Sequence, residues 1–156
     1  MRFVSVAETE YPLFHRLMND YYREGEDAQT PQDELDGFIR MLYDFCAQGK
    51  IMGAVAYDSV PVGFVLWNID SSDGVFCQKP GFGTILEIGI CPEFRRKNLG
   101  TQLVKHAIDQ MPVTDHYVCA YGPAETFWRH CGFWDSNEIG SNGLKIYVRQ
   151  SDGFEG

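Results

Sequence analysis

The sequence lacks any long hydrophobic run, and none approaches the roughly 18 residues that a membrane-spanning helix requires. Its first residues also lack the apolar core of a secretory signal peptide. The five cysteines are odd in number and include no C-x-x-C pair, which argues against a zinc site and against a disulfide framework. These absences predict a reduced, cytoplasmic protein that binds neither a metal ion nor a membrane.

Positive charge is scarce as well. The 156 residues include 13 Lys and Arg against 22 Asp and Glu, a formal net charge of −9. Because nucleic-acid binding draws its affinity from neutralised phosphates, this balance argues against a nucleic-acid partner. The length and the 44% hydrophobic content suit one globular domain, and no repeat or linker divides the chain. We expect this single domain over residues 1–150 and a frayed tail over residues 151–156.

What the sequence does contain is an apolar strand pattern that passes through a short basic turn into a helical pattern. Residues 84–91 form the strand pattern, Arg95, Arg96 and Lys97 lie in the turn, and apolar residues recur at helical spacing from Leu99 onward. The leading N–H groups of a helix have no intrahelical acceptor and carry the positive end of its dipole, so they bind phosphates well. The segment therefore predicts an anion-binding loop.

Two residues of this turn carry conformational predictions. Asn98 is one of the few residue types besides glycine that tolerate a positive φ. Gly100 has no Cβ, so a ligand can approach its backbone closely. The alternative is an ordinary solvated connection in which the three cations face water.

The periodicity predicts an α/β protein, of the α+β type, with a mixed sheet in the order β-α-α-β-β-β-α-β-α-β-β. Thr30 is expected to cap the second helix, with Pro31 at its first position. Residues 70–83 are polar and glycine-rich, and they form either a plain loop or a lid over a site. Strands are expected near residues 2–7, 51–57, 61–69, 84–91, 116–121, 133–137 and 144–149.

The basic turn resembles a loop of a known family. Pro92-Glu93-Phe94-Arg95-Arg96-Lys97-Asn98-Leu99-Gly100 is similar to the Arg/Gln-x-x-Gly-x-Gly/Ala pyrophosphate loop of the GCN5-related N-acetyltransferase (GNAT) superfamily, with Asn98 in place of the first glycine. Downstream, the segment 124–133 resembles the second signature of that superfamily, an Ala and an aromatic residue four apart ahead of Gly-Phe. The resemblance implies a GNAT-like acyl-coenzyme A N-acyltransferase fold, with acetyl-coenzyme A as the default donor.

The resemblance also implies where the coenzyme lies. The pantetheine arm would follow the strand before the loop, where backbone donors would hydrogen-bond the acyl carbonyl. Gly89, inside this apolar strand, indicates a bulge or a close backbone approach, with a local packing accident as the alternative. The implied coenzyme-binding residues are Ile88, Gly89, Ile90, Arg95, Arg96, Lys97, Asn98, Leu99, Gly100, Thr101 and Trp128.

Glu87 is the candidate general base. Alternation along the strand places Leu86, Ile88 and Ile90 on one face and Glu87 on the other. The family often has an acid or a water-binding residue at this position, from which it can accept a proton. The alternative is a glutamate that faces solvent or forms a salt bridge.

At the position where the family commonly has its general acid, this sequence has a different residue. The superfamily commonly has a Tyr four residues before the closing glycine, and this chain has Trp128, whose indole N–H is far too weak an acid. Tyr121 is our candidate instead, with His130, Cys131 and unaided departure of the thiolate as alternatives. A chain without the acid would fit a second function, a non-catalytic acyl-coenzyme A-binding or regulatory module.

The acceptor site of this fold lies between the first two helices and the late strands. Tyr21 and Tyr22 lie there beside Glu24 and Glu26, and such a rim could hold a cationic amine by charge and cation–π contact. A solvated helix-capping loop is the alternative. We predict direct transfer of an acetyl group from acetyl-coenzyme A to a primary amine of a small molecule or peptide. The oligomeric state stays open, with a homodimer as one option.

Overall fold

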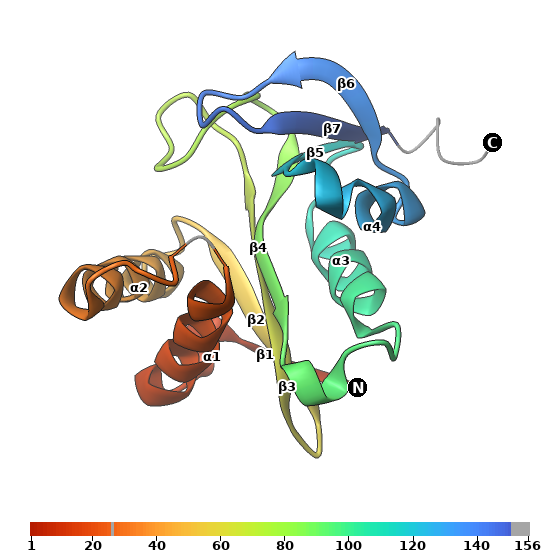
Figure 1. Ribbon diagram of the computed structural model, residues 1–156. Coiled ribbons are helices and arrows are strands. Elements are labelled where there is room, and N and C mark those ends of the chain that lie inside the picture. The colour runs from red at the N-terminus through yellow and green to blue at the C-terminus, as the bar shows by residue number, and fades with distance from the viewer. Residues whose placement is uncertain (26, 151–156) are drawn as a thin grey trace.

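The sheet of the computed structural model has seven strands (Figure 1), and the structure describes residues 1–25 and 27–150. The strands follow the order β1-β2-β3-β4-β5-β7-β6, and every neighbouring pair is antiparallel except β4 and β5. Their bounds are β1 Arg2–Ser5, β2 Met52–Asp58, β3 Val60–Ile69, β4 Gly83–Ile90, β5 Asp115–Ala120, β6 Trp134–Ile139 and β7 Lys145–Gln150.

Four helices cover the two faces of this sheet. Helices α1 (Tyr11–Glu24) and α2 (Gln32–Ala47) pack on one face, and α3 (Leu99–Gln110) and α4 (Glu125–His130) pack on the other (Figure 1). Each face buries its own apolar cluster, because the apolar residues of each helix recur on one side. The predicted order of strands and helices is confirmed. Glu26 and the predicted tail 151–156 lie outside the described residues.

No helix in the described part of the chain is both long and apolar enough to cross a membrane.

The sheet separates between its two parallel strands. Pairing between β4 and β5 is limited to Gly83 with His116 and Thr84 with Tyr117, at the start of both strands. Beyond these two pairs, the edge of β4 that faces β5 has no partner strand among the described residues. The two halves of the sheet therefore diverge toward the carboxyl ends of β4 and β5, where polar backbone groups become available to a ligand.

A bulge in β4 changes which side chains share a face. Leu66 on β3 pairs with Glu87 and the next residue pairs with Ile85, so Leu86 is the extra residue. Leu86 packs against the cluster under α1 and α2, whereas Ile88 packs against the opposite cluster. The prediction that Leu86 and Ile88 share a face was therefore wrong, because strict alternation does not hold through a bulge.

The predicted bulge at Gly89 is also wrong, since Gly89 pairs regularly with Phe64. The close approach is correct, but it involves side chains of the protein. A Cβ on Gly89 would lie 2.6 Å from the Phe64 ring and 2.9 Å from the Tyr21 ring. Glycine is required here because two aromatic rings pack directly on the strand.

Two predicted helix and strand boundaries also differ. The first strand ends at Ser5 and a short 3₁₀ turn, Val6–Glu8, follows it. Thr30 does not cap α2, which begins at Gln32 with Pro31 as the residue before it. The Thr30 hydroxyl instead donates to the Asp27 carboxylate at 3.0 Å, within the preceding connection.

The long loop between β3 and β4 is held in place by one buried carboxylate. Asp70 is 3% exposed and accepts hydrogen bonds from the backbone N–H groups of Gln78 and Lys79 and from the Tyr117 hydroxyl. The loop also reaches the β6–β7 end of the sheet, where the Lys79 ammonium lies 2.8 Å from the Glu138 carboxylate. These contacts favour the plain loop over the alternative of a movable lid.

Candidate functional site

The basic turn ends in an uncapped helix N-terminus. Asn98 precedes α3 with φ 62° and ψ 21°, which confirms the predicted positive φ, and its side chain makes no capping hydrogen bond. The first hydrogen bond of the helix joins the Gln102 N–H to the Asn98 carbonyl at 3.4 Å. The N–H groups of Leu99, Gly100 and Thr101 therefore have no acceptor within the helix and face the position an anion would take.

Gly100 has a packing role that the sequence did not reveal. A Cβ at this position would lie 3.0 Å and 3.2 Å from two ring carbons of Phe127 on α4. Gly100 therefore lets α3 and α4 approach closely, in addition to any room it leaves for a ligand. The same ring lines the larger cavity described below, so the helix N-terminus and the cavity are neighbours.

The three cations of the turn do not act together. Arg95 turns away from α3: its Nε donates to the Ile90 carbonyl at 3.0 Å and its Nη2 lies 2.9 Å from Glu24 Oε1 on α1. The Lys97 ammonium lies 5.6 Å from the centre of the Phe94 ring, and Arg96 is exposed. In this structure Arg95 therefore contacts α1 and the end of β4, whereas Arg96 and Lys97 stay near the turn.

The open edge of β4 presents backbone groups of two residues. The Cys91 N–H bonds to the Val62 carbonyl on β3, and backbone direction alternates along a strand. The N–H and C=O of Ile88 and Ile90 therefore point the other way, toward the edge that β5 leaves open. Gly89 directs its groups to β3, so of the three predicted backbone donors it does not face this edge.

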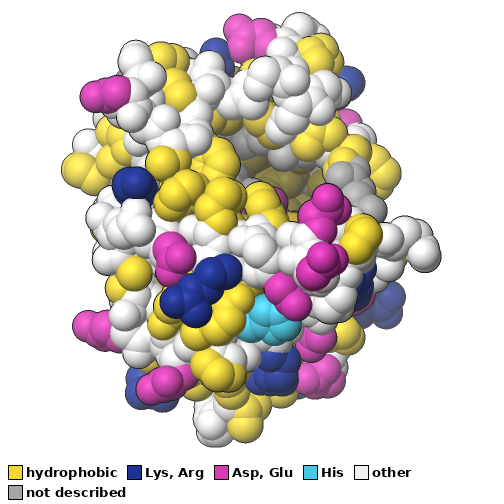
Figure 2. Space-filling model, turned by 90° about the vertical axis from the view of Figure 1, so that its left-hand side faces the viewer, with side chains coloured by type: hydrophobic (Ala, Val, Ile, Leu, Met, Phe, Trp, Pro, Cys, Tyr) yellow, Lys and Arg dark blue, Asp and Glu magenta, His cyan; other side chains and the backbone are white. Residues whose placement is uncertain are grey.

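A cavity of about 720 Å³ lies where the sheet separates. Its walls come from α1, the start of α2, β4, the end of β5 and α4, and this face of the molecule is visibly hollowed in its upper half (Figure 2). Its size is that of a typical small-molecule site. The charged residues of the wall are Glu24, Asp27, Glu87 and Arg95, and the aromatic ones are Tyr21, Tyr22, Phe38, Tyr121, Phe127 and Trp128.

Glu87 and Tyr22 lie close enough to interact in this wall. Glu87 is half-buried, and its register opposite Leu66 turns it to the α1 side. It lies opposite Ile88 and Ile90, as predicted, but on the same side as Leu86. Burial, followed by the charge of Glu87, raises the pKa of Tyr22, so this hydroxyl stays protonated. Tyr22 is 7% exposed, and its hydroxyl has no hydrogen-bond partner among the described residues. The structure thus brings Tyr22 and the candidate base together.

The candidates for the acid separate clearly. Trp128 is 7% exposed, stacks edge-on with Phe127 and Phe133, and also lines the cavity. Cys131 is buried and burial raises the pKa of its thiol to about 11, while His130 is exposed outside the cavity wall. Tyr121, 47% exposed and directly after β5, is the candidate with an ionisable hydroxyl that lines the cavity.

The acidic residues between α1 and α2 do not form one rim. Glu24 and Asp27 line the cavity, whereas Asp36 lies 2.7 Å from His15 and ties α2 to α1. The connection itself is organised by Arg23, whose guanidinium donates to the carbonyls of residues 27, 28 and 30 at 2.7, 3.3 and 2.7 Å. Glu26, a predicted acceptor residue, is outside the described residues.

Sequence comparison identifies the family. The model of the Acetyltransferase (GNAT) family matches residues 11–133, most of the chain, and the chain therefore belongs to this family of acetyltransferases. No curated protein matches the sequence.

Solved structures agree on the fold. An acetyltransferase from Thermus thermophilus superposes with a TM-score of 0.72 at 20% identity, covering 96% of this chain and 97% of that one. The PaiA N-acetyltransferase of Thermoplasma acidophilum, in complex with coenzyme A, gives 0.64 at 15% identity, covering 96% and 99%. A chimeric spermidine N-acetyltransferase from Vibrio cholerae gives 0.69 at 13% identity over the whole of both chains. The protein shares the GNAT acyltransferase fold.

Sequence reasoning missed several cavity residues. Phe38 on α2 is 41% exposed and lines the cavity wall. Phe127 on α4 and Asp27 in the connection between α1 and α2 line the same wall. Their roles depend on where two distant segments meet, and no local pattern carries that information.

Proposed function

We propose that the protein is an acetyl-coenzyme A-dependent N-acetyltransferase that acts by direct transfer on a primary amine of a cationic small molecule or peptide. One observation carries the proposal: the cavity of about 720 Å³ joins the open edge of β4 to a wall rich in acids and aromatic rings. The uncapped start of α3 lies beside it, across the Phe127 ring. A donor and an acceptor can therefore meet in one connected space.

The residues present fit coenzyme A. The N–H groups of Leu99, Gly100 and Thr101, with Asn98, suit the pyrophosphate, and Arg96 and Lys97 add positive charge. The backbone groups of Ile88 and Ile90 suit the amides of the pantetheine arm, and Trp128 offers an apolar wall near its thioester end. The coenzyme supplies the activated acetyl group as a thioester.

In the proposed reaction the amine nitrogen attacks the thioester carbonyl carbon, and the carbon–sulfur bond breaks. Glu87 takes the proton that the amine loses, either directly or through a water molecule. The Tyr121 phenol returns a proton to the departing thiolate. Glu87 on β4 and Tyr121 directly after β5 both line the cavity, where these two strands diverge, so they can act on opposite sides of the reacting carbon.

Direct transfer is favoured over a route through an acetylated cysteine. Cys119 is the cysteine in the cavity wall, and burial raises the pKa of its thiol. A thiol held protonated is a poor nucleophile. The remaining cysteines of the described residues lie outside this wall.

A cationic acceptor is favoured by the balance of charge in the wall. Glu24, Asp27 and Glu87 oppose Arg95, the one cation among the described residues of the wall, and the tyrosine rings add cation–π capacity. The spermidine N-acetyltransferase that shares the fold acts on a substrate of this chemical class.

The test is turnover. Purified protein is mixed with acetyl-coenzyme A and a panel of amines that includes spermidine, lysine peptides and neutral primary amines, and the release of free thiol is followed. We expect release with cationic amines above the rate without acceptor. Coenzyme A binding without release for any amine would favour the non-catalytic module, for which the buried Trp128 is the specific observation.

Glu87→Gln tests the base. We expect kcat to fall by roughly 100-fold, the usual contribution of a positioned base, with the affinity for coenzyme A unchanged. Glu34→Gln, which alters an exposed acid at the start of α2, serves as the control. An unchanged kcat for Glu87→Gln at saturating substrate across the pH range would exclude the role.

A further inference from the structure

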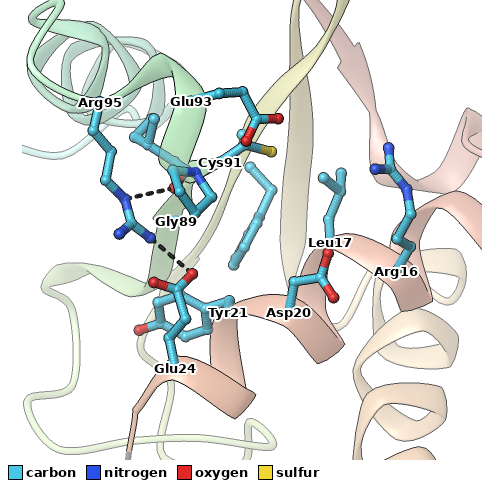
Figure 3. Close-up of a pocket in the computed structure, with 13 residues that line it drawn as sticks. Arg16, Leu17, Asp20, Tyr21, Glu24, Gly89, Cys91, Glu93 and Arg95 are labelled. Atoms are coloured by element: carbon cyan, nitrogen blue, oxygen red, sulfur yellow. Dashed lines mark hydrogen bonds and ion pairs between the residues drawn. The ribbon is translucent and has the colours of Figure 1, made fainter.

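The Arg95–Glu24 ion pair connects the two binding regions of the site. It joins the start of the basic loop to the last residue of α1, across the end of β4 (Figure 3). Both side chains line the larger cavity and also a smaller neighbouring pocket of about 60 Å³. The pair therefore forms part of the boundary between these two spaces, and we call it the Arg95–Glu24 bridge.

Arg95 also occupies part of the predicted path of the coenzyme. Its Nε donates to the Ile90 carbonyl, one of the backbone acceptors on the open edge of β4. A pantetheine amide that runs along this edge would need the same carbonyl. The guanidinium thus holds a position that the coenzyme would use.

The guanidinium has a better partner once a pyrophosphate is present. Arg95 is three residues before Asn98, at the start of the loop whose backbone N–H groups lead into α3. Guanidinium–phosphate pairs are charge-assisted and often bidentate. The contact to Glu24 is a single pair, with side chains 46% and 44% exposed, so solvent weakens it.

We propose that coenzyme A binding exchanges this bridge: Arg95 leaves Glu24 and the Ile90 carbonyl and pairs with the pyrophosphate. Glu24 thereby competes with the coenzyme for Arg95 and is a positioning residue for the donor site. The exchange also removes a positive charge from the wall of the acceptor cavity and frees a carboxylate there. The proposal rests on the proposed function, because it requires coenzyme A as the ligand.

The competition sets the size of the expected effect. Exposed ion pairs contribute about 0.2–1 kcal/mol, which corresponds to a change of roughly 1.5-fold to fivefold in a dissociation constant. Removing the competitor while keeping Arg95 should therefore tighten coenzyme A binding by about that factor. A merely structural role for Glu24 would leave the affinity unchanged or weaken it.

The experiment is a calorimetric titration of coenzyme A into the wild type, Glu24→Gln, Arg95→Ala and the double variant. Glu93→Gln is the matched control, since it removes the same charge from the lining of the smaller pocket without touching the bridge. We expect Glu24→Gln to bind about twofold to fivefold more tightly and Glu93→Gln to bind much as the wild type does. In the Arg95→Ala background, Glu24→Gln should give no gain.

Three results would overturn the exchange. The first is an equal affinity for wild type and Glu24→Gln, the second is an equal gain in Glu93→Gln, and the third is a gain that persists without Arg95. The last two would show a general charge effect. Undetectable coenzyme A binding by the wild type would contradict the proposed function itself, and the exchange with it, so the two failures can be told apart.

Discussion

The basic loop before α3 and the connection between α1 and α2 are both helix ends, and they satisfy their backbone in opposite ways. At the start of α3, Asn98 makes no capping bond, so the first N–H groups stay available. After α1, the guanidinium of Arg23 donates hydrogen bonds to three backbone carbonyls of the connection. The start of α3 leaves its backbone donors uncapped, whereas the connection after α1 is bonded by a cation of the protein itself.

The difference shows which atoms carry function in each region. In the basic loop the backbone N–H groups are the proposed contacts to the coenzyme, so the conformation at Asn98 should matter more than its side chain. In the connection three backbone carbonyls are already bonded to Arg23, and the side chain of Asp27 lines the cavity. Substitutions should therefore act on the donor site through φ and ψ, and on the acceptor site through Arg23.

Among the tests of this comparison, the largest effect is expected from Asn98→Val. A β-branched residue in the left-handed region costs about 1–2 kcal/mol, and the loop would relieve this cost by changing its backbone conformation. We expect the affinity for coenzyme A to fall about tenfold, as measured by titration. Asn98→Gly, which keeps the same φ without strain, should bind within about twofold of the wild type. Normal binding by the valine variant would show that the loop backbone is not the anion site.

A smaller and different effect is expected from Arg23→Ala. Three carbonyls lose a charged donor, and we expect the free energy of unfolding to fall by about 1–2 kcal/mol, measured in urea. The KM for the acceptor should rise while the affinity for coenzyme A stays constant. Lys105→Ala, which removes an exposed helical cation paired with Asp109, is the control and should cost a few tenths at most. Weaker coenzyme A binding in Arg23→Ala would contradict the separation of the two regions.

The smallest effect concerns pH. The hydrogen bond from His15, with a second from Gln32, lowers the pKa of Asp36. Because the folded-state pKa lies below the unfolded value, this stabilisation is present above the ordinary Asp pKa of about 3.9 and is lost as pH falls through the folded value. The Tm difference between wild type and Asp36→Asn should stay constant near neutral pH and close in acid.

Much of the fold could be predicted from the sequence because it depends on local patterns. Strand alternation and helical spacing determine the element order, and the residue type at position 98 fixes its backbone conformation. The basic loop was found for the same reason, since its strand, turn and helix start are contiguous. Features that depend on one short segment can therefore be predicted from the sequence of that segment alone.

The rest depends on contacts between distant segments. The partner of Arg95 is a residue 71 positions earlier in the chain, and the rings that exclude a side chain at Gly89 come from α1 and β3. The bulge at Leu86 could not be predicted either, because no glycine marks that position in the sequence. The prediction that Thr30 caps α2 was wrong for the same reason, namely a contact between separate segments. The local sequence has a capping pattern, but it does not show that the guanidinium of Arg23 donates to the Thr30 carbonyl.

The separation of β4 from β5 gives one strand two kinds of amide. The N–H groups of Gly89 and Cys91 are bonded into the sheet through β3, while those of Ile88 and Ile90 face the open edge. Neighbouring residues should therefore exchange their amide hydrogens with solvent on very different timescales, although they share the same element and similar burial. A ligand bound along this edge would accept hydrogen bonds as an eighth strand does. It would slow amide hydrogen exchange at Ile88 and Ile90, while exchange at Gly89 and Cys91 would stay the same.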